Sequence, residues 1–149
     1  MGDFDFLVGD WQVANRRLVQ RLVGCTDWEE FHATSVAWSV LGGAGNVDQF
    51  TFPDGTSALT VRLFDPARQE WSLYWSTSVE GTLFPPVVGG FVDGVGTFYG
   101  RDVHEAAPVL VRYVWSGITE SAARWEQAFS VDEGSTWETN WIMQLSRSR

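Results

Sequence analysis

Turn-forming residues recur along this chain at near-even spacing, and the segments between them alternate apolar and polar side chains. Alternation with a period of two is typical of strands that bury one face, and no segment keeps a helical period for three turns. The pattern predicts about ten strands, at residues 11–23, 28–41, 46–52, 58–64, 70–77, 87–92, 95–102, 109–116, 122–131 and 136–146. Short turns favour an up-and-down antiparallel meander, and closing it removes the exposed edges that promote aggregation. We therefore expect an all-β chain in which residues 1–149 form a single domain, a closed or nearly closed barrel.

The later strands separate their side chains into an aromatic face and a charged face. The aromatic face comprises Trp71, Leu73, Trp75, Val111, Tyr113, Trp115, Trp125, Gln127, Phe129, Trp137, Thr139, Trp141, Met143 and Leu145. A row of Trp side chains turned toward water would form a large apolar patch, so this face is predicted to line the lumen. On the opposite face we expect a solvated cross-strand ladder of Arg112, Arg124, Glu126 and Glu138.

The first strands are expected to add a polar stripe to the same lumen. A four-residue turn at 24–27 would pair residue 23 with residue 28, and so Arg21 with Glu30. In that register Arg17 and Arg21 point inward, as do Glu30, His32 and Trp38 on the next strand. The third strand is expected to turn Asn46 and Asp48 inward near the closed end, where they satisfy buried backbone groups. A lumen with an aromatic wall and a polar stripe suits an amphipathic ligand.

Composition narrows the possible partners. The formal net charge of −9 argues against nucleic acid, because binding phosphates needs a basic face. The single cysteine, Cys25, cannot form an internal disulfide, which fits a reducing compartment. The apolar run at residues 4–8 is too short for a signal peptide, and no stretch approaches the ~20 apolar residues of a membrane helix. We expect a cytoplasmic monomer or homodimer without nucleic-acid or membrane partners.

Several segments together resemble a known family. They are residues 3–11, 41–48, 84–91, 124–130 and 136–143. This set resembles a bacterial family of uncharacterised calycin-like (lipocalin-like) proteins with an FxFxxGxW opening and a TWxxxW-type closing strand. The resemblance implies a lipocalin-like β-barrel, but no established reaction or ligand. In such barrels the Trp of a Gly-x-Trp motif closes one end, and an Arg near the end of the last strand lies over its ring. Here these residues would be Trp11 and Arg147, in a cation–π contact of about 0.5–2 kcal/mol.

The fold is also similar to the ten-stranded nitrobindins, which bind haem through a histidine on a late strand. This chain has no histidine after His104, so that ligand does not carry over and no cofactor is expected.

Two arginines are the candidates for holding a ligand carboxylate or phosphate through bidentate hydrogen bonds, provided that no bulge near Arg16 turns them outward. The predicted ligand-binding residues are Arg17, Arg21, Trp38, Trp75, Tyr113, Trp115, Trp125, Gln127 and Trp141. Residues 78–90 form the longest irregular segment and would lie over the mouth.

Catalytic and metal-binding signals are sparse. His32 beside Glu30 could act as a general acid or base, and His104 belongs to another loop at the mouth; each could equally be a plain surface residue. Asp102, His104 and Glu105 could offer metal ligands, but a structural zinc site needs four, and we expect no metal. Phosphate-loop, Rossmann and nucleophile-elbow motifs are absent.

These observations favour binding of a small hydrophobic or aromatic, and possibly anionic, ligand in the lumen. The alternative is a cofactor-independent isomerase, cyclase or hydrolase acting on a hydrophobic metabolite, with His32, Glu30 or His104 moving a proton. A third hypothesis is a purely structural role, which would leave the lumen filled by side chains.

Overall fold

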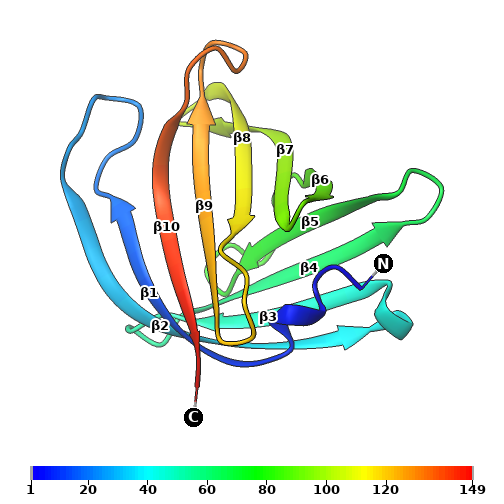
Figure 1. The fold of residues 1–149 in the computed structure, drawn as a ribbon. Helices are drawn as coiled ribbons and strands as arrows, with labels where there is room; N and C mark the ends of the chain where they lie inside the picture. The colour runs from blue at the N-terminus through cyan, green and yellow to red at the C-terminus, as the bar shows by residue number, and fades with distance from the viewer. Residues whose placement is uncertain (1, 149) are drawn as a thin grey trace.

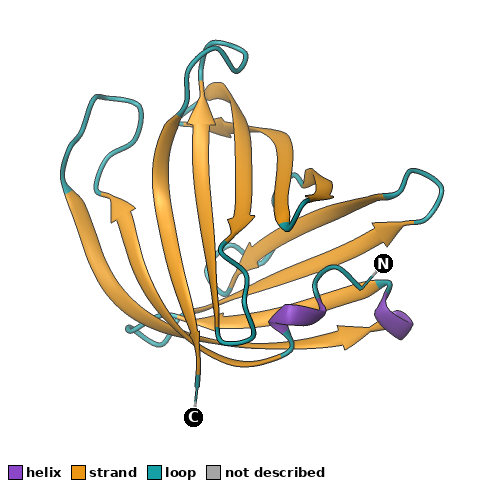
Figure 2. Ribbon diagram, viewed as in Figure 1, coloured by secondary structure: helices purple, strands orange, loops and turns teal. Residues whose placement is uncertain are grey.

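Ten antiparallel strands close into one barrel in the computed structural model, which describes residues 2–148 (Figures 1 and 2). Each strand pairs with its neighbours in the sequence, and the first strand pairs with the last to complete the ring. The strands are β1 (Gly9–Leu18), β2 (Trp28–Val40), β3 (Gly45–Thr51), β4 (Ser57–Asp65), β5 (Glu70–Thr77), β6 (Val87–Val92), β7 (Val95–His104), β8 (Ala107–Ser116), β9 (Ala122–Ser130) and β10 (Glu138–Arg147). The predicted all-β, up-and-down closed barrel is confirmed.

Two short 3₁₀ helices complete the fold: η1 (Asp5–Leu7) precedes β1, and η2 (Leu41–Gly43) joins β2 to β3. Among residues 2–148, no helix combines the length and the apolar character needed to span a membrane.

One end of the barrel is closed by Trp11 and Arg147, as the sequence predicts. The two residues are paired in the β1–β10 register, and the Arg147 guanidinium carbon lies 4.0 Å from the centroid of the Trp11 ring. The Trp11 indole N–H donates to the Leu7 carbonyl at 2.8 Å. Gly9 is needed here: its φ is 119°, and a Cβ would lie 2.7 Å from the Arg147 guanidinium.

The segment before β1 fills this end from inside. The Phe4 ring packs edge-on against Trp71 at 5.0 Å and against Phe91 at 5.1 Å, measured between ring centroids. It also lies 5.8 Å from the Phe98 ring, and Phe4, Trp71 and Phe98 are all fully buried. The lower part of the lumen is therefore a packed core.

The later strands turn their aromatic face inward. Buried inner residues include Trp71, Leu73, Val111, Trp115, Trp125, Phe129, Trp141, Met143 and Leu145. On the outer face Arg124 pairs with Glu126 at 3.4 Å, but along β9 and not across strands as the predicted ladder required. Glu138, also expected in that ladder, instead accepts the Leu22 N–H at 2.7 Å.

The face of β2 is opposite to the prediction. The connection between β1 and β2 is residues 19–27, not a four-residue turn, so Arg17 pairs with Glu29 and Leu18 pairs with Trp28. This register differs from the expected one by an odd number of residues, which moves every side chain to the other face. Small residues, Ala33, Ser35 and Ala37, therefore line the inside of β2.

The start of β10 is also reversed. A bulge between Thr139 and Trp141 shifts the pairing with β9, so the residues before it change face. Trp137, predicted to be inside, lies beneath the Arg112 guanidinium at 4.4 Å on the outer face. Asn140, predicted to be outside, is 0% exposed.

Candidate functional site

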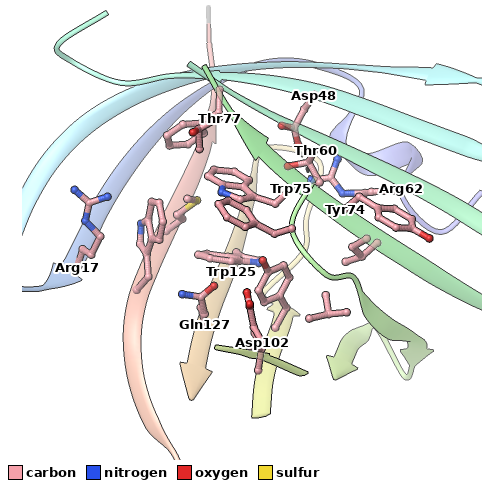
Figure 3. A pocket seen from close by; sticks show the side chains of 18 of the residues that line it. Arg17, Asp48, Thr60, Arg62, Tyr74, Trp75, Thr77, Asp102, Trp125 and Gln127 are labelled. Atoms are coloured by element: carbon pink, nitrogen blue, oxygen red, sulfur yellow. Dashed lines mark hydrogen bonds and ion pairs between the residues drawn. The ribbon is translucent and has the colours of Figure 1, made fainter. Parts of the chain in front are cut away.

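A cavity of about 380 Å³ remains in the upper half of the barrel (Figure 3). Aromatic side chains wall it without filling it, among them Trp75, Trp115, Trp125 and Trp141. Pockets for small ligands typically span roughly 300–1,000 Å³. The filled lumen expected for a purely structural role is therefore not observed.

Trp141 lies at the centre of the aromatic wall. Its ring meets Trp125 at 5.7 Å and Trp75 at 6.1 Å, both nearly edge-to-face. Its indole N–H donates to the Asn15 side-chain oxygen at 2.9 Å, and Asn15 is itself buried. Edge-to-face contacts and this hydrogen bond hold the wall in one arrangement before any ligand arrives.

Arg17 points into the cavity but already has partners. Its Nε donates to Glu29 Oε1 at 2.7 Å, and its guanidinium lies over the rings of Phe31 and Trp141 at 4.8 and 4.9 Å. The bulge that would have turned Arg17 outward is absent from the β1 register of the described chain. Arg17 thus contributes a positive field that Glu29 largely neutralises.

Arg21 is the less satisfied cation at the mouth. Its guanidinium lies 5.2 Å from the Phe129 ring, and among residues 2–148 no carboxylate oxygen comes within 4.0 Å of it. Burial, and after it the charge of Arg17, lowers the pKa of Arg21. Because arginine nonetheless stays protonated at neutral pH, an anion at the mouth would compensate this charge.

Three polar side chains interrupt the aromatic wall below the mouth: Tyr113, Gln127 and Asp102. Tyr113 and Gln127 are directly paired across β8 and β9. Burial, and after it the charge of Asp102, raises the pKa of Tyr113 to about 12. Figure 3 shows Gln127 and Asp102 pointing into the cavity near Trp125.

The floor carries a buried ion pair that the sequence did not reveal. Arg62, 4% exposed, is paired with Asp48 and donates to Asn46 Oδ1 at 2.8 Å. Its guanidinium also lies over the Phe4 ring at 5.2 Å. Asn46 and Asp48 do point inward as predicted, and Asn46 also donates to the Phe4 carbonyl, but their main partner is Arg62. The sequence signal that could have revealed Arg62 was its position two residues after Thr60 on β4, which places both side chains on the inward face.

Three predicted site residues lie outside the cavity because β2 is reversed. Trp38 is 43% exposed on the outer face. Glu30 pairs with Arg16 at 3.5 Å, and the His32 ring hydrogen-bonds the Gln12 side chain. Trp38 is thereby removed from the ligand-binding set, and Glu30 and His32 cannot act on a molecule in the lumen. For Arg17, Arg21, Trp75, Tyr113, Trp115, Trp125, Gln127 and Trp141, which line the cavity, the binding role stays a prediction.

His104 lines the mouth, with its ring 5.9 Å from that of Phe129. Within the described part of the chain, no three His, Cys, Asp or Glu side chains gather as a metal site. The expected absence of a metal and of a cofactor stays a prediction. The irregular segment before β6 contributes Glu80, Phe84 and Pro85 to the lining of the cavity. That residues 78–90 lie over the mouth stays a prediction.

The fold and the cavity together define a lipocalin-like, or calycin-like, barrel with a partly open lumen. No protein-family model matches the sequence, and no curated protein matches it. Among solved structures, the chain is similar to the S-type phycobiliprotein lyase CPES from Guillardia theta, with a TM-score of 0.60 and 11% identity, over 98% of this chain and 90% of that one. It is also similar to Rv2717c from M. tuberculosis, with a TM-score of 0.60 and 13% identity, over 100% and 99%. At such identities the likeness shows a shared fold alone.

Proposed function

We propose that this protein binds a small hydrophobic or aromatic anion inside the barrel. One observation carries the proposal: a preformed aromatic cavity opens at a mouth where no carboxylate of residues 2–148 lies within ion-pair distance of the Arg21 guanidinium. Trp75, Trp125 and Trp141 offer ring faces and edges to an apolar body. Removing apolar surface from water contributes roughly 25 cal/mol per Å².

The anionic group belongs at Arg21 rather than at Arg17. Glu29 already accepts a hydrogen bond from the Nε of Arg17. Among residues 2–148, Arg21 has a ring contact with Phe129, and the charge of Glu138 acts on it only from beyond ion-pair distance. A carboxylate, sulfonate or phosphate at Arg21 would form charge-assisted hydrogen bonds in a partly desolvated place, where they are stronger than in water. The net charge of −9 repels anions at long range, so the anion would be held by its local contact with Arg21 and not attracted by the overall field of the protein.

A matched pair of dyes tests this proposal. Anilinonaphthalene sulfonate and N-phenyl-naphthylamine share one aromatic skeleton, and only the first carries an anion. We expect both to quench the Trp fluorescence by binding in the lumen. Arg21→Met should weaken the sulfonate about tenfold and leave the neutral dye within about twofold, because only the anion loses a charge-assisted partner.

Trp38→Ser is the control variant, since Trp38 is an exposed indole outside the barrel on which a dye could bind non-specifically. If Trp38→Ser abolishes dye binding, the dye binds at the outer surface and the proposal is contradicted. If Arg21→Met weakens both dyes equally, Arg21 does not recognise the anion, and the proposal is contradicted as well.

The enzymatic alternative receives less support from the geometry. It relied on Glu30, His32 and His104, and the first two lie on the outer face. Of the three, His104 alone remains at the mouth, and its ring has no hydrogen-bond partner among residues 2–148. A single proton-transfer group without a positioned partner is a weak basis for catalysis.

The remaining assignments are proposals of the same kind. We infer that residues 1–149 are a single domain, that the chain belongs with the bacterial calycin-like family its opening motif resembles, and that it is a cytoplasmic monomer or homodimer. The Trp11–Arg147 closure supports the family assignment. One structural neighbour is named a phycobiliprotein lyase, so at least one barrel of this fold has a function beyond a structural role.

A further inference from the structure

We propose that the ligand also carries a hydrogen-bond donor, an O–H or N–H group, that binds between Gln127 and Asp102 on the cavity wall formed by β7, β8 and β9. The inference rests on the proposed function, because it names a second recognition group in the same cavity. It restricts the ligand class to aromatic anions with a donor group at the end opposite the anion.

Gln127 presents a fixed acceptor to the cavity. It is only 8% exposed, and its Nε2 donates to Asn140 Oδ1 at 2.8 Å. The bulge in β10 holds Asn140 inside the barrel, where it is 0% exposed. Because Gln127 donates to Asn140, the orientation of the Gln127 amide is fixed as well. Its Oε1 has no partner among residues 2–148 and lines the cavity, although a polar atom this deep ordinarily has one.

Asp102 supplies a second acceptor with spare capacity. It lies on the inner side of β7, and its Oδ1 accepts the N–H of Val103 at 2.7 Å. Among residues 2–148, no Lys, Arg or His nitrogen comes within 4.0 Å of its carboxylate. A carboxylate has roughly four lone-pair sites, and a donor on the ligand would fill one of those left open here.

Tyr113 stands beside Gln127 as a donor. Their strand positions are directly opposed, which places the two side chains within about 5 Å of each other at Cβ. With its pKa raised to about 12, the phenol keeps its proton at neutral pH. In the strand register Asp102 lies two inward positions nearer the mouth than Tyr113, and its charge still acts on the Tyr113 phenol. Two acceptors and one donor therefore line the same wall of the cavity, which suits a hydroxyl or amide group. A second carboxylate on the ligand would instead be repelled by Asp102.

The spacing along β9 sets the distance between the two recognition groups. Arg21 lies over Phe129, and Gln127 is the next inward residue below Phe129 on the same strand. Two residues of a strand span roughly 7 Å. Substituents at opposite ends of a naphthalene frame match this separation.

Three naphthoates test the contribution of the donor group to affinity: 2-naphthoate, 6-hydroxy-2-naphthoate and 6-methoxy-2-naphthoate. All three carry the anion and the aromatic body, and only the hydroxyl compound has a donor at the far end. We expect titration calorimetry to show that the wild-type protein binds the hydroxyl compound about tenfold more tightly than the other two, because a buried acceptor discriminates against a ligand without a donor.

Asp102→Asn and Gln127→Met should each reduce the methoxy-to-hydroxyl ratio of dissociation constants from about tenfold to within about threefold. Asp93→Asn is the matched control, because it removes one carboxylate from the exposed β6–β7 turn and should keep the tenfold ratio. Thermal unfolding checks the fold of each variant, and Asp102→Asn suffices if Gln127→Met is unstable.

The outcomes distinguish this inference from the proposed function. If 2-naphthoate binds in an Arg21-dependent manner and the hydroxyl group adds nothing, the inference is overturned and the function stands. A hydroxyl preference that survives Asp102→Asn also overturns it. If neither the naphthoates nor anilinonaphthalene sulfonate bind, the proposed function is overturned, and this inference with it.

Discussion

The closed end and the mouth of the barrel are built from the same residue types, and they differ in whether the arginines have partners. At the closed end Arg147 lies on the Trp11 ring and donates to the carbonyls of Phe6 and Val8. At the mouth Arg21 contacts the ring of Phe129 and no carboxylate of the described residues. In an aromatic barrel, therefore, an arginine with hydrogen-bond partners indicates packing, and one without a carboxylate partner indicates a candidate binding site. Composition alone does not distinguish the two ends.

The aromatic rings differ in the same way. At the closed end Phe4 fills the space between the rings of Trp71, Phe91 and Phe98. Farther up, Trp75 and Trp125 both meet Trp141 edge-on, yet a cavity remains beside them. The filled region should govern stability, and the open one should govern binding.

The sharpest test of this contrast is one substitution made at both ends. Trp11→Ala should lower the free energy of unfolding by about 4 kcal/mol, because it leaves a cavity, an unpaired Leu7 carbonyl and an uncovered Arg147. Trp75→Ala, at the half-buried wall, should cost about 1 kcal/mol and weaken dye binding instead. Urea unfolding and dye titration measure the two effects, and equal losses of stability at both sites would remove the contrast.

The floor ion pair should be the next largest effect. Asp48→Asn leaves the Arg62 guanidinium buried without its counter-charge and should lower the free energy of unfolding by about 3 kcal/mol. Replacing both residues with apolar ones, Asp48→Leu with Arg62→Met, should recover most of that loss in the same urea experiment. A double variant as unstable as Asp48→Asn would show that the pair contributes more than charge compensation.

The two arginines should respond in opposite ways to the same change. Arg147→Met should cost about 2 kcal/mol of stability, because it breaks hydrogen bonds to backbone carbonyls and the stacking on Trp11. Arg21→Met should change the unfolding free energy by less than about 0.5 kcal/mol, since it removes no ion pair with any of residues 2–148. A clear destabilisation by Arg21→Met would mean that this side chain is structural.

Alkaline pH provides the smallest and most local test. The folded-state pKa of Tyr113 is about 12, against about 10 for an exposed tyrosine. Between these values the folded protein keeps a proton that the unfolded chain loses, so stability present below pH 10 declines toward pH 12. By pH 11 the wild-type protein should lose about 1 kcal/mol more than Tyr113→Phe does, relative to pH 8. Equal losses in both proteins would place the Tyr113 phenol in contact with water.

Where the strands were long and their alternation unbroken, the sequence was sufficient to predict the faces. Trp71, Trp115 and Trp125 belong to such strands, and all three are buried inside. The Trp11–Arg147 closure was predictable because both residues stand at fixed places in the motif.

The wrong predictions arise where a connection or a bulge shifts which side chains of a strand face the lumen. Trp38 was placed inside because a four-residue turn at 24–27 was expected, but the nine-residue connection 19–27 sets the register of β2. Asn140 was placed outside because a bulge is invisible in an otherwise regular pattern. Arg62 was missed because its partner Asp48 lies on another strand, and pairing between strands depends on a register that composition does not specify.

A crystal structure with bound anilinonaphthalene sulfonate tests the central claim most directly. We predict that the naphthalene ring lies among Trp75, Trp125 and Trp141, with the sulfonate within hydrogen-bond distance of the Arg21 guanidinium. A dye bound only at Trp38, or a lumen closed by rearranged indoles, would contradict the account.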